Sequence, residues 1–360
     1  MVATLIALLV LGGLVVVHEL GHFLVAHWSG VRVLRFSVGF GPRLLTWRRR
    51  HTEYAVSAIP LGGYVKMAGE QRSEASHEPW EYLSKPLWTR AAIVFAGPFV
   101  NYLVALVSLW TVFIIGYPEL LPVVGKVMDD MPAKTAGFRL NDRVEAVGGQ
   151  AVRTWDEMTK LIYASPDRPL TFHLNRDGTA LELTVTPKPK TITDPFGRQK
   201  NVGLIGIAPS GDFHPYRVGP IAAIGRTIHQ QNEWVAQTML GLWSLATGKL
   251  PLRDSVTGPV GIIFLTSEAV HLGFAPLLFL VSLFSLSLAL FNVFPIPILD
   301  GGHLLFLALE KLRGRPVSIN IQERSAQVSL MLLATLLVLV CVNDVSRFGL
   351  MEKMMDWIRR

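Results

Sequence analysis

The segment VVVHELGHFLVAH, residues 15–27, places two histidines and a glutamate inside a run of Val, Leu and Phe. The run extends from Met1 to Trp28, contains no Lys, Arg or Asp, and is long enough for the roughly 20 apolar residues that a bilayer core requires. A glutamate inside a span costs about 2.5–3.5 kcal/mol on insertion scales, and ionisable residues in spans usually mark function. The segment therefore predicts a retained membrane span that carries chemistry.

The composition agrees with a polytopic membrane protein. Half of the 360 residues (50%) are hydrophobic and 17% are charged, whereas soluble domains average about 25% charged residues. Three further stretches, at residues 91–117, 272–299 and 326–343, lack Lys, Arg and Asp and are long enough, or nearly so, to span. Cys341 is the single cysteine, so a metal site has to use His and carboxylate ligands. No nucleic-acid-binding motif with interleaved basic and aromatic residues occurs, and we expect no nucleic-acid partner.

Charge indicates the orientation of the spans. The loop at residues 32–90 is basic and includes the run Arg48, Arg49 and Arg50, and short basic loops stay in the cytoplasm. This places the N-terminus outside, and the basic loop at residues 311–324 then also falls on the cytoplasmic side. The basic tail at residues 347–360 would lie outside, which conflicts mildly with the positive-inside rule.

The chain divides into three parts by composition. Residues 121–210 lie in a polar region with alternating strand patterns such as LTFHLNR, which predicts a small α+β domain on the outer side. Residues 1–120 and 211–360 are the two halves of the membrane core. Residues 31–70 alternate between apolar and polar residues with Gly and Pro breaks, and they predict short β-hairpins near the cytoplasmic membrane face. The stretch at residues 218–249 reads as an amphipathic interfacial helix.

The sequence HELGH matches the pattern H-E-x-x-H. His18 and His22 are one helical turn apart and project from the same face, so both imidazoles can bind one zinc ion. Glu19 is rotated away from that face, in the position of a base for a metal-bound water. Two histidines do not complete a catalytic zinc site, which typically has three protein ligands and one open position.

Candidates for the third ligand follow the third apolar stretch. The sequence NVFPIPILDGGH contains Asp300 and His303, and Glu310 lies just beyond. By the charge-based topology, the first and third spans run in the same direction, so their C-terminal ends meet on one side of the membrane. Zinc accepts both His₃ and His₂Asp sites, so the residue types leave Asp300 and His303 open.

The same segment suggests where a substrate could bind. Pro295 and Pro297 lack an N–H group and break the helix just before the candidate ligands. An unwound segment and the nearby hairpins offer free backbone groups to an extended substrate. Asn292, inside the span, is either a clamp on the substrate backbone or an interhelical hydrogen-bonding residue.

Six motifs together extend over the chain. They are HELGH (18–22), GFG (39–41), GGYVKM (62–67), FAGPFVN (95–101), GPVGI (258–262) and NVFPIPILDGGH (292–303). In this order they resemble the site-2 proteases, intramembrane zinc metalloproteases, in the bacterial branch typified by the regulator of sigma-E protease.

The resemblance implies one zinc ion per chain, bound by His18, His22 and Asp300, with Glu19 as the catalytic base. It also implies that Asn292 clamps the substrate, with Pro295 and Pro297 in the adjacent extended segment. The motifs GFG and GGYVKM resemble membrane-associated β-elements that engage substrate, which adds Gly63 and Tyr64 to the expected substrate-binding residues.

The outer domain resembles a circularly permuted PDZ module. Permutation would move its carboxylate-binding loop to GLIGI at residues 203–207, and Asn141 replaces the glycine that usually precedes Asp142. Some relatives carry two PDZ modules, whereas this chain has room for one. The expected fold is thus a polytopic α-helical membrane protein of about four spans, with membrane-associated β-hairpins and one inserted α+β PDZ domain.

The expected function is intramembrane cleavage of transmembrane segments from proteins already trimmed on the outer side. By resemblance, the substrates include an anti-sigma factor cut by a site-1 protease and remnant signal peptides, in a stress response. The protein is expected in the bacterial inner membrane, with the PDZ domain extracytoplasmic and the active site toward the cytoplasm. The alternative is a non-catalytic membrane scaffold that binds partners through the PDZ domain, although a scaffold has no need of Glu19.

Overall fold

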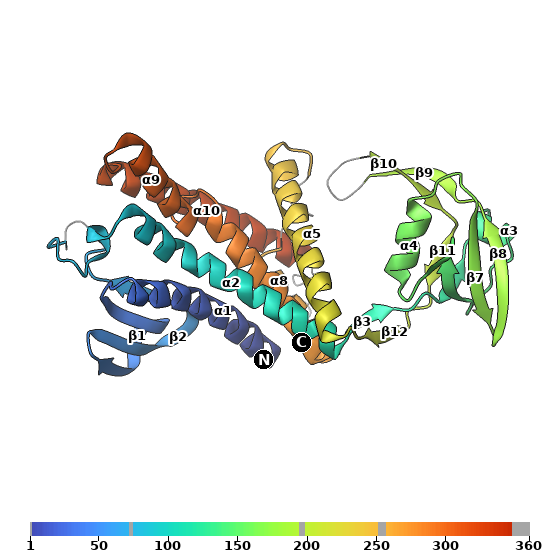
Figure 1. Ribbon diagram of the computed structural model, residues 1–360, viewed down its shortest axis with the longest axis horizontal. Helices are drawn as coiled ribbons and strands as arrows, with labels where there is room; N and C mark the ends of the chain where they lie inside the picture. Colours follow the sequence, from blue (N-terminus) through green and yellow to red (C-terminus); the bar gives the residue numbers. More distant parts are fainter. Residues whose placement is uncertain (1, 72–74, 194–198, 251–256, 348–360) are drawn as a thin grey trace, which may run out of the picture. The chain divides into compact units, whose positions relative to one another are not determined.

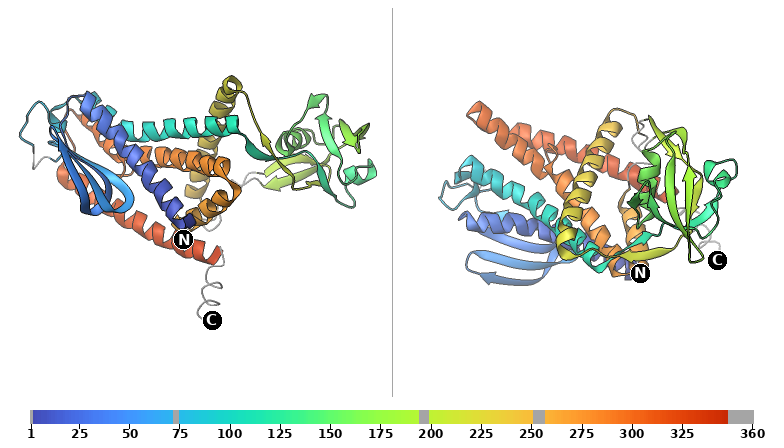
Figure 2. Two further views of the ribbon diagram at one scale, coloured as in Figure 1. Left: turned by 90° about the horizontal axis from the view of Figure 1, so that it is seen from below. Right: turned by 45° about the vertical axis from the view of Figure 1, so that its right-hand side comes forward.

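The computed structural model describes residues 2–71, 75–193, 199–250 and 257–347. The chain forms two compact units, and the second is inserted into the first. Residues 1–111 and 256–360 make up the first unit, and residues 112–255 make up the second. Figures 1 and 2 show the helices of the first unit and the small sheets of the second.

Four long apolar helices are present in the described residues: α1 (Val2–Trp28), α2 (Leu87–Ile115), α8 (Phe274–Val293) and α10 (Ile319–Arg347). Each contains a segment long and apolar enough to cross a membrane, so the expected four spans are confirmed by length and composition. The short apolar helix α7 (Pro259–Leu272) precedes α8, and α9 (Asp300–Arg313) follows it.

Small and hydroxylated residues bring the helices of the membrane core together. The Ser285 hydroxyl of α8 donates to the Asn101 carbonyl oxygen of α2 at 2.7 Å. Gly21 allows α1 to approach α2 closely, because a Cβ at this position would lie 2.4 Å from the Ala96 carbonyl oxygen. Lipid gives no hydrophobic driving force between helices, so close packing and hydrogen bonds of this kind carry their association.

A buried aspartate connects α10 to α7. The Asp344 carboxylate is fully buried and accepts hydrogen bonds from the backbone N–H groups of Gly258, at 3.2 Å, and Gly261, at 2.9 Å. The first N–H groups of a helix have no intrahelical partner, and the helix dipole favours a negative charge there. The GPVGI motif thus forms the start of α7, and Asp344 accepts hydrogen bonds from two of the backbone N–H groups there.

Residues 33–67 form one antiparallel hairpin that folds back on itself, built from β1 (Val33–Arg49) and β2 (Thr52–Met67). The first half of β1 pairs with both ends of β2, so that Arg35 lies opposite Lys66 on one side and Glu53 on the other. Where the sequence predicted several short hairpins, the structure has one long curled sheet. Its last segment, residues 63–67, has β1 on one side, and β2 packs against α1.

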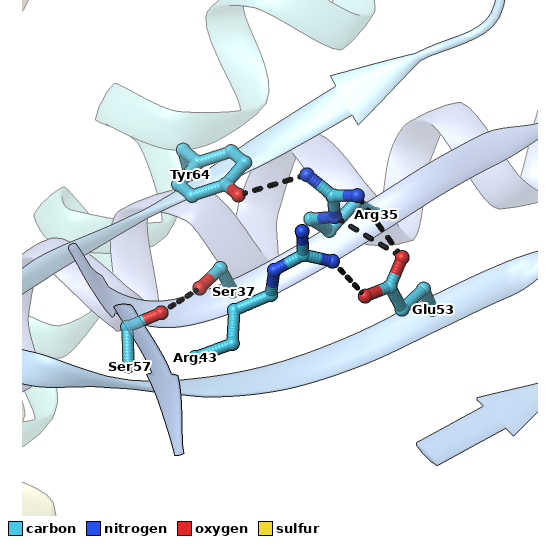
Figure 3. A network of polar contacts seen from close by, with 6 residues as sticks. All are labelled: Arg35, Ser37, Arg43, Glu53, Ser57 and Tyr64. Carbon is cyan, nitrogen blue, oxygen red and sulfur yellow. Dashed lines mark hydrogen bonds and ion pairs between the residues drawn. The ribbon is translucent and has the colours of Figure 1, made fainter. Parts of the chain in front are cut away.

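An ion-pair network holds the curled sheet together (Figure 3). The Arg35 guanidinium donates to the Glu53 carboxylate at 3.0 Å and to the Tyr64 hydroxyl at 3.3 Å. Arg43 donates to the other oxygen of the same carboxylate at 2.6 Å. These hydrogen bonds lower the pKa of Glu53, and the bond from Arg43 has a larger effect than those from Arg35. The network thereby connects Tyr64, near the end of β2, to both halves of β1.

The second unit contains small antiparallel sheets around one apolar core. A four-stranded sheet has the order β6-β5-β7-β8, and the pairs β10-β9, β11-β4 and β12-β3 accompany it. The Phe172 side chain of β7 is fully buried in the core, together with Met158 of α4. The elements, in order, are β3 (Tyr117–Leu120), β4 (Val124–Val127), α3 (Pro132–Thr135), β5 (Arg143–Val147), β6 (Gln150–Ala151), α4 (Trp155–Tyr163), β7 (Leu170–Arg176), β8 (Thr179–Val185), β9 (Lys188–Thr193), β10 (Gln199–Leu204), β11 (Ile207–Pro209), β12 (Phe213–Tyr216) and α5 (Pro220–Ala246).

The turn before β5 explains the departure from glycine noted in the sequence. Asn141 has a φ of +66°, in the left-handed region that Gly and, less often, Asn adopt. The next residue, Asp142, is fully buried and accepts hydrogen bonds from the Arg176 guanidinium at 2.6 Å and from the Arg139 backbone N–H at 2.7 Å. Asn141 therefore adopts a backbone conformation that glycine also reaches without strain.

Candidate metal centre

The histidines of the H-E-x-x-H motif meet the aspartate of the LDGG motif in the first unit. His18 and His22 lie one turn apart on α1, with their Nε2 atoms 3.2 Å apart. The Asp300 Oδ2 atom lies 2.9 Å from His18 Nε2 and 3.5 Å from His22 Nε2. Two imidazole nitrogens and one carboxylate oxygen, all from side chains largely shielded from solvent, therefore lie close together.

The turn between α8 and α9 brings Asp300 to the histidines. α8 ends at Val293, Phe294 is extended, and α9 begins at Asp300 itself. The glycine after Asp300 is required for this geometry, because a Cβ on Gly301 would lie 2.2 Å from the Val293 carbonyl oxygen. The predicted break at the prolines is thus present, and LDGG packs directly against the end of the span.

His22 is oriented by a backbone carbonyl of α2. Its Nδ1 atom lies 2.8 Å from the Ile93 carbonyl oxygen. Because a carbonyl only accepts, Nδ1 carries the proton and Nε2 presents its lone pair toward Asp300. Metal-binding histidines characteristically donate their second N–H group in this way.

The surroundings of the three atoms fit a metal ion. A Cβ on Gly97 of α2 would lie 2.4 Å from His22 Nε2 and 2.7 Å from His18 Nε2, so a residue without a side chain keeps this space open. The Asp300 Oδ2 atom is buried and has no well-directed hydrogen bond from a described residue. A His₂Asp donor set with an open position matches the chemistry of catalytic zinc.

Glu19 lines the same cavity as His18, His22 and Asp300 but is not part of their cluster. Its Oε2 atom accepts a hydrogen bond from the Val65 backbone N–H of β2 at 3.1 Å. Val65 belongs to the last segment of the curled sheet, and its N–H points toward α1 instead of along the sheet. The carboxylate is therefore held by a strand that is distant from it in sequence.

A cavity of about 730 Å³ opens onto this centre. Of the residues expected to bind substrate, Asn292 and Pro297 line the cavity, whereas Pro295, Gly63 and Tyr64 are not among its lining residues. The next residues of β2, Val65 and Met67, line it instead. His303 also lines the cavity but lies outside the set of three converging atoms.

Ile93, Gly97 and Val65 contribute to the centre without having been singled out from the sequence. Ile93 and Val65 act through backbone atoms, which no residue pattern reveals. Gly97 lies in the FAGPFVN motif, to which the sequence alone assigned no role. The sequence signal for Gly97 was a glycine inside an apolar span. Glycine destabilises a helix, so its presence there indicates that another group lies close to the helix backbone.

A core of membrane-spanning helices in which an H-E-x-x-H helix faces a second, carboxylate-bearing helix has the architecture of an intramembrane metalloprotease. The sequence profile of peptidase family M50 matches residues 6–336, which is most of the chain. This protein belongs to peptidase family M50, the site-2 protease family. It is a zinc metalloendopeptidase and a multi-pass membrane protein.

Similar proteins are found in several bacteria. A Rhizobium meliloti protein, provisionally named a zinc metalloprotease, is 37% identical over 92% of this chain and 93% of its own length. The zinc metalloprotease RasP of Geobacillus kaustophilus is 29% identical over 95% of this chain and 97% of its own length. The regulator of sigma-E protease RseP of Salmonella typhimurium is 30% identical over 94% of this chain and 97% of its own length.

A PDZ domain of an SdrC-like protein from Listeria monocytogenes matches 26% of this chain and 88% of its own length. The sequence identity is 19% and the TM-score is 0.20.

Proposed function

We propose that His18, His22 and Asp300 bind the zinc ion of an intramembrane endopeptidase and that Glu19 is its catalytic base. The observation that carries this proposal is the convergence of two Nε2 atoms from α1 and one carboxylate oxygen from the start of α9. His303 is the weaker candidate, because it lies outside this cluster.

The zinc ion, when bound, lowers the pKa of a water molecule to about 7 and polarises the scissile carbonyl. Glu19 accepts the proton of this water when the water oxygen adds to the carbonyl carbon. Because Oε2 already accepts the Val65 N–H, Oε1 is the oxygen available for the proton. The C–N bond then breaks, and Glu19 transfers the proton to the leaving amine.

We infer that the substrate binds as an extended strand between β2 and the segment after α8. A transmembrane helix hides its amides in its own hydrogen bonds, so its cleavage requires local unwinding. The N–H of Val65 points away from the sheet toward the centre, which is the side on which strand addition would occur. Asn292 and Pro297, at the end of α8 and in the segment after it, line the same cavity as Val65. Gly63, Tyr64 and Pro295 would support the extended strand from positions adjacent to these residues.

The proposed substrates are transmembrane segments of proteins already trimmed outside the cell membrane, such as a site-1-cleaved anti-sigma factor or remnant signal peptides. The protein would lie in the bacterial inner membrane, with the catalytic centre toward the cytoplasm. The inserted unit would be an extracytoplasmic PDZ module that limits entry of untrimmed substrates or holds new C-termini. If deletion of residues 122–209 left the cleavage rates of full-length and trimmed substrates unchanged, this role of the module would be wrong.

The test of the catalytic assignment compares wild type with Glu19→Gln on a model transmembrane substrate in detergent. Glu19→Gln is expected to retain zinc and lose cleavage. The control Glu268→Gln, at an exposed carboxylate of α7, is expected to retain both zinc and cleavage. Equal cleavage by wild type and Glu19→Gln, or cleavage by neither, would contradict the catalytic assignment. Zinc analysis of His22→Ala tests the ligands, and a zinc content equal to that of wild type would exclude the assignment.

A further inference from the structure

One face of α2 contacts both histidines of the centre. Ile93, Gly97 and Asn101 are spaced four residues apart, so they lie on the same side of the helix. Ile93 accepts from His22 Nδ1, and Gly97 leaves the space beside the two Nε2 atoms. The third residue, Asn101, is fully buried, and its Nδ2 atom lies 3.4 Å from His18 Nδ1.

The contact between Asn101 and His18 raises a chemical conflict. Nδ2 of an asparagine only donates, so in this orientation His18 Nδ1 has to accept and His18 Nε2 has to carry the proton. A protonated Nε2 has no lone pair for a metal ion. The orientation therefore contradicts the role of His18 as a ligand, although His18 Nε2 lies 2.9 Å from Asp300.

Rotating the carboxamide of Asn101 by 180° removes the conflict. The NH₂ group and the oxygen of a carboxamide have nearly the same shape, so hydrogen bonding decides between the two orientations. Asn101 Oδ1 is buried and accepts no hydrogen bond from a described residue, so the rotation gives up only the contact between Nδ2 and His18 Nδ1. After the rotation, Oδ1 faces His18 Nδ1 and can accept a hydrogen bond from an Nδ1–H group, which leaves the Nε2 lone pair free.

We propose that Asn101 is a positioning residue whose carboxamide oxygen accepts the Nδ1–H of His18 and thereby fixes the tautomer and ring orientation of a zinc ligand. This inference rests on the proposed ligand set. The Ser285 hydroxyl of α8 holds the Asn101 backbone carbonyl at 2.7 Å, so a third helix contributes to the position of the carboxamide. α2 thus supplies the outer hydrogen-bond acceptors for both histidines.

The test measures the zinc dissociation constant of the purified full-length protein by competition with a chelator. Asn101→Leu keeps the branched shape of the side chain but removes the acceptor, and we expect a loss of about 10–100-fold in affinity, as is typical for outer partners of metal ligands. Asn101→Asp keeps an acceptor oxygen and should hold zinc within a few-fold of wild type. The control Ser282→Ala removes a hydrogen bond to the Ala105 carbonyl between the same two helices and should bind zinc as wild type does.

The Asp variant separates positioning from structure. If Asn101 had only a structural role, a buried carboxylate at this position would disturb the protein at least as much as a leucine does. Zinc affinity would then fall as far in Asn101→Asp as in Asn101→Leu. That result, or wild-type affinity in Asn101→Leu, overturns the proposal. The visible spectrum of the Co²⁺-substituted protein gives a second readout, which should change in Asn101→Leu and stay unchanged in Ser282→Ala.

Two further variants complete the design. If Asn101→Leu does not fold, Asn101→Ser replaces it, because a serine hydroxyl is too short to reach His18 and should weaken zinc binding in the same way. His22→Ala is measured in parallel. Wild-type zinc affinity in His22→Ala would refute the ligand set itself, whereas loss in His22→Ala with retention in Asn101→Leu would refute only the role of Asn101.

Discussion

Glu19 of α1 and Val65 of β2 are joined by a hydrogen bond of 3.1 Å from the Val65 backbone N–H to the Glu19 carboxylate. The residues are 46 positions apart, and the bond couples the proposed base to the last segment of the curled sheet. The same segment is the proposed docking strand for substrate. We therefore expect substrate binding to this strand and the orientation of the Glu19 carboxylate to affect each other.

Val65→Pro should remove this bond without removing the side chain of Glu19. Proline is tolerated on edge strands where its missing N–H does not face the sheet. Because a positioned general base contributes about 10²–10⁴-fold, we expect kcat to fall by about tenfold to a hundredfold with zinc content unchanged. Val65→Ala keeps the N–H and is the matched control. A Val65→Pro enzyme with the kcat of Val65→Ala would show that the bond does not orient the base.

The stability contributed by Glu53 should depend on pH. Its pKa in the folded protein lies below the ordinary value of 4.5, because Arg43 and Arg35 stabilise the carboxylate. A depressed folded-state pKa contributes stability that is fully present above the unfolded-state pKa and is lost as pH falls through the folded-state pKa.

Thermal unfolding of wild type and Glu53→Gln in detergent measures this contribution. We expect wild type to be the more stable protein at pH 7 and the two unfolding temperatures to converge as pH falls below 4.5. A difference that stays constant across this range would exclude titration of Glu53 as its source.

Asp344 should stabilise the contact between α10 and α7. Removing its carboxylate leaves the N–H groups of Gly258 and Gly261 without their acceptor. Hydrogen bonds to charged groups contribute about 1.5–3 kcal/mol each, so we expect Asp344→Ala to lower the free energy of unfolding by about 3 kcal/mol. Asp344→Asn keeps one acceptor oxygen and should fall between wild type and Asp344→Ala. An unfolding temperature of Asp344→Ala equal to that of wild type would contradict this role.

The sequence predicted the residues that act through side-chain chemistry more completely than those that act through the backbone. His18, Glu19 and His22 follow from a motif whose spacing is that of a helix, and the four spans follow from apolar length. Asp300 was one of several candidates until a family resemblance selected it. The structure gives this selection a geometric basis, because α9 begins at Asp300 beside both histidines.

The contacts that were missed have no signature in residue type. The Ile93 carbonyl and the Val65 amide could belong to any residue at those positions. The curl of the β1-β2 sheet was missed for a related reason. Alternation of apolar and polar residues predicts a strand but does not say that one half of β1 pairs with both ends of β2.

Gly97 provides the sharpest test of the space between the helices. A Cβ at this position would lie 2.4 Å from His22 Nε2 and 2.7 Å from His18 Nε2, which is nearly the distance of a metal ligand and far inside a van der Waals contact. Gly97→Ala should therefore displace the imidazoles or fill the position of the zinc ion. We expect zinc affinity to fall by at least about tenfold, with cleavage lost in proportion.

Gly13→Ala is the matched control for Gly97→Ala, because Gly13 lies in α1 and a Cβ there would meet no atom within 4 Å. It should bind zinc and cleave substrate as wild type does. Thermal unfolding of both variants in chelator separates loss of the site from loss of the fold, since Gly97→Ala should unfold near the temperature of metal-free wild type. Wild-type zinc affinity in Gly97→Ala would mean that the metal ion does not occupy the space between α1 and α2.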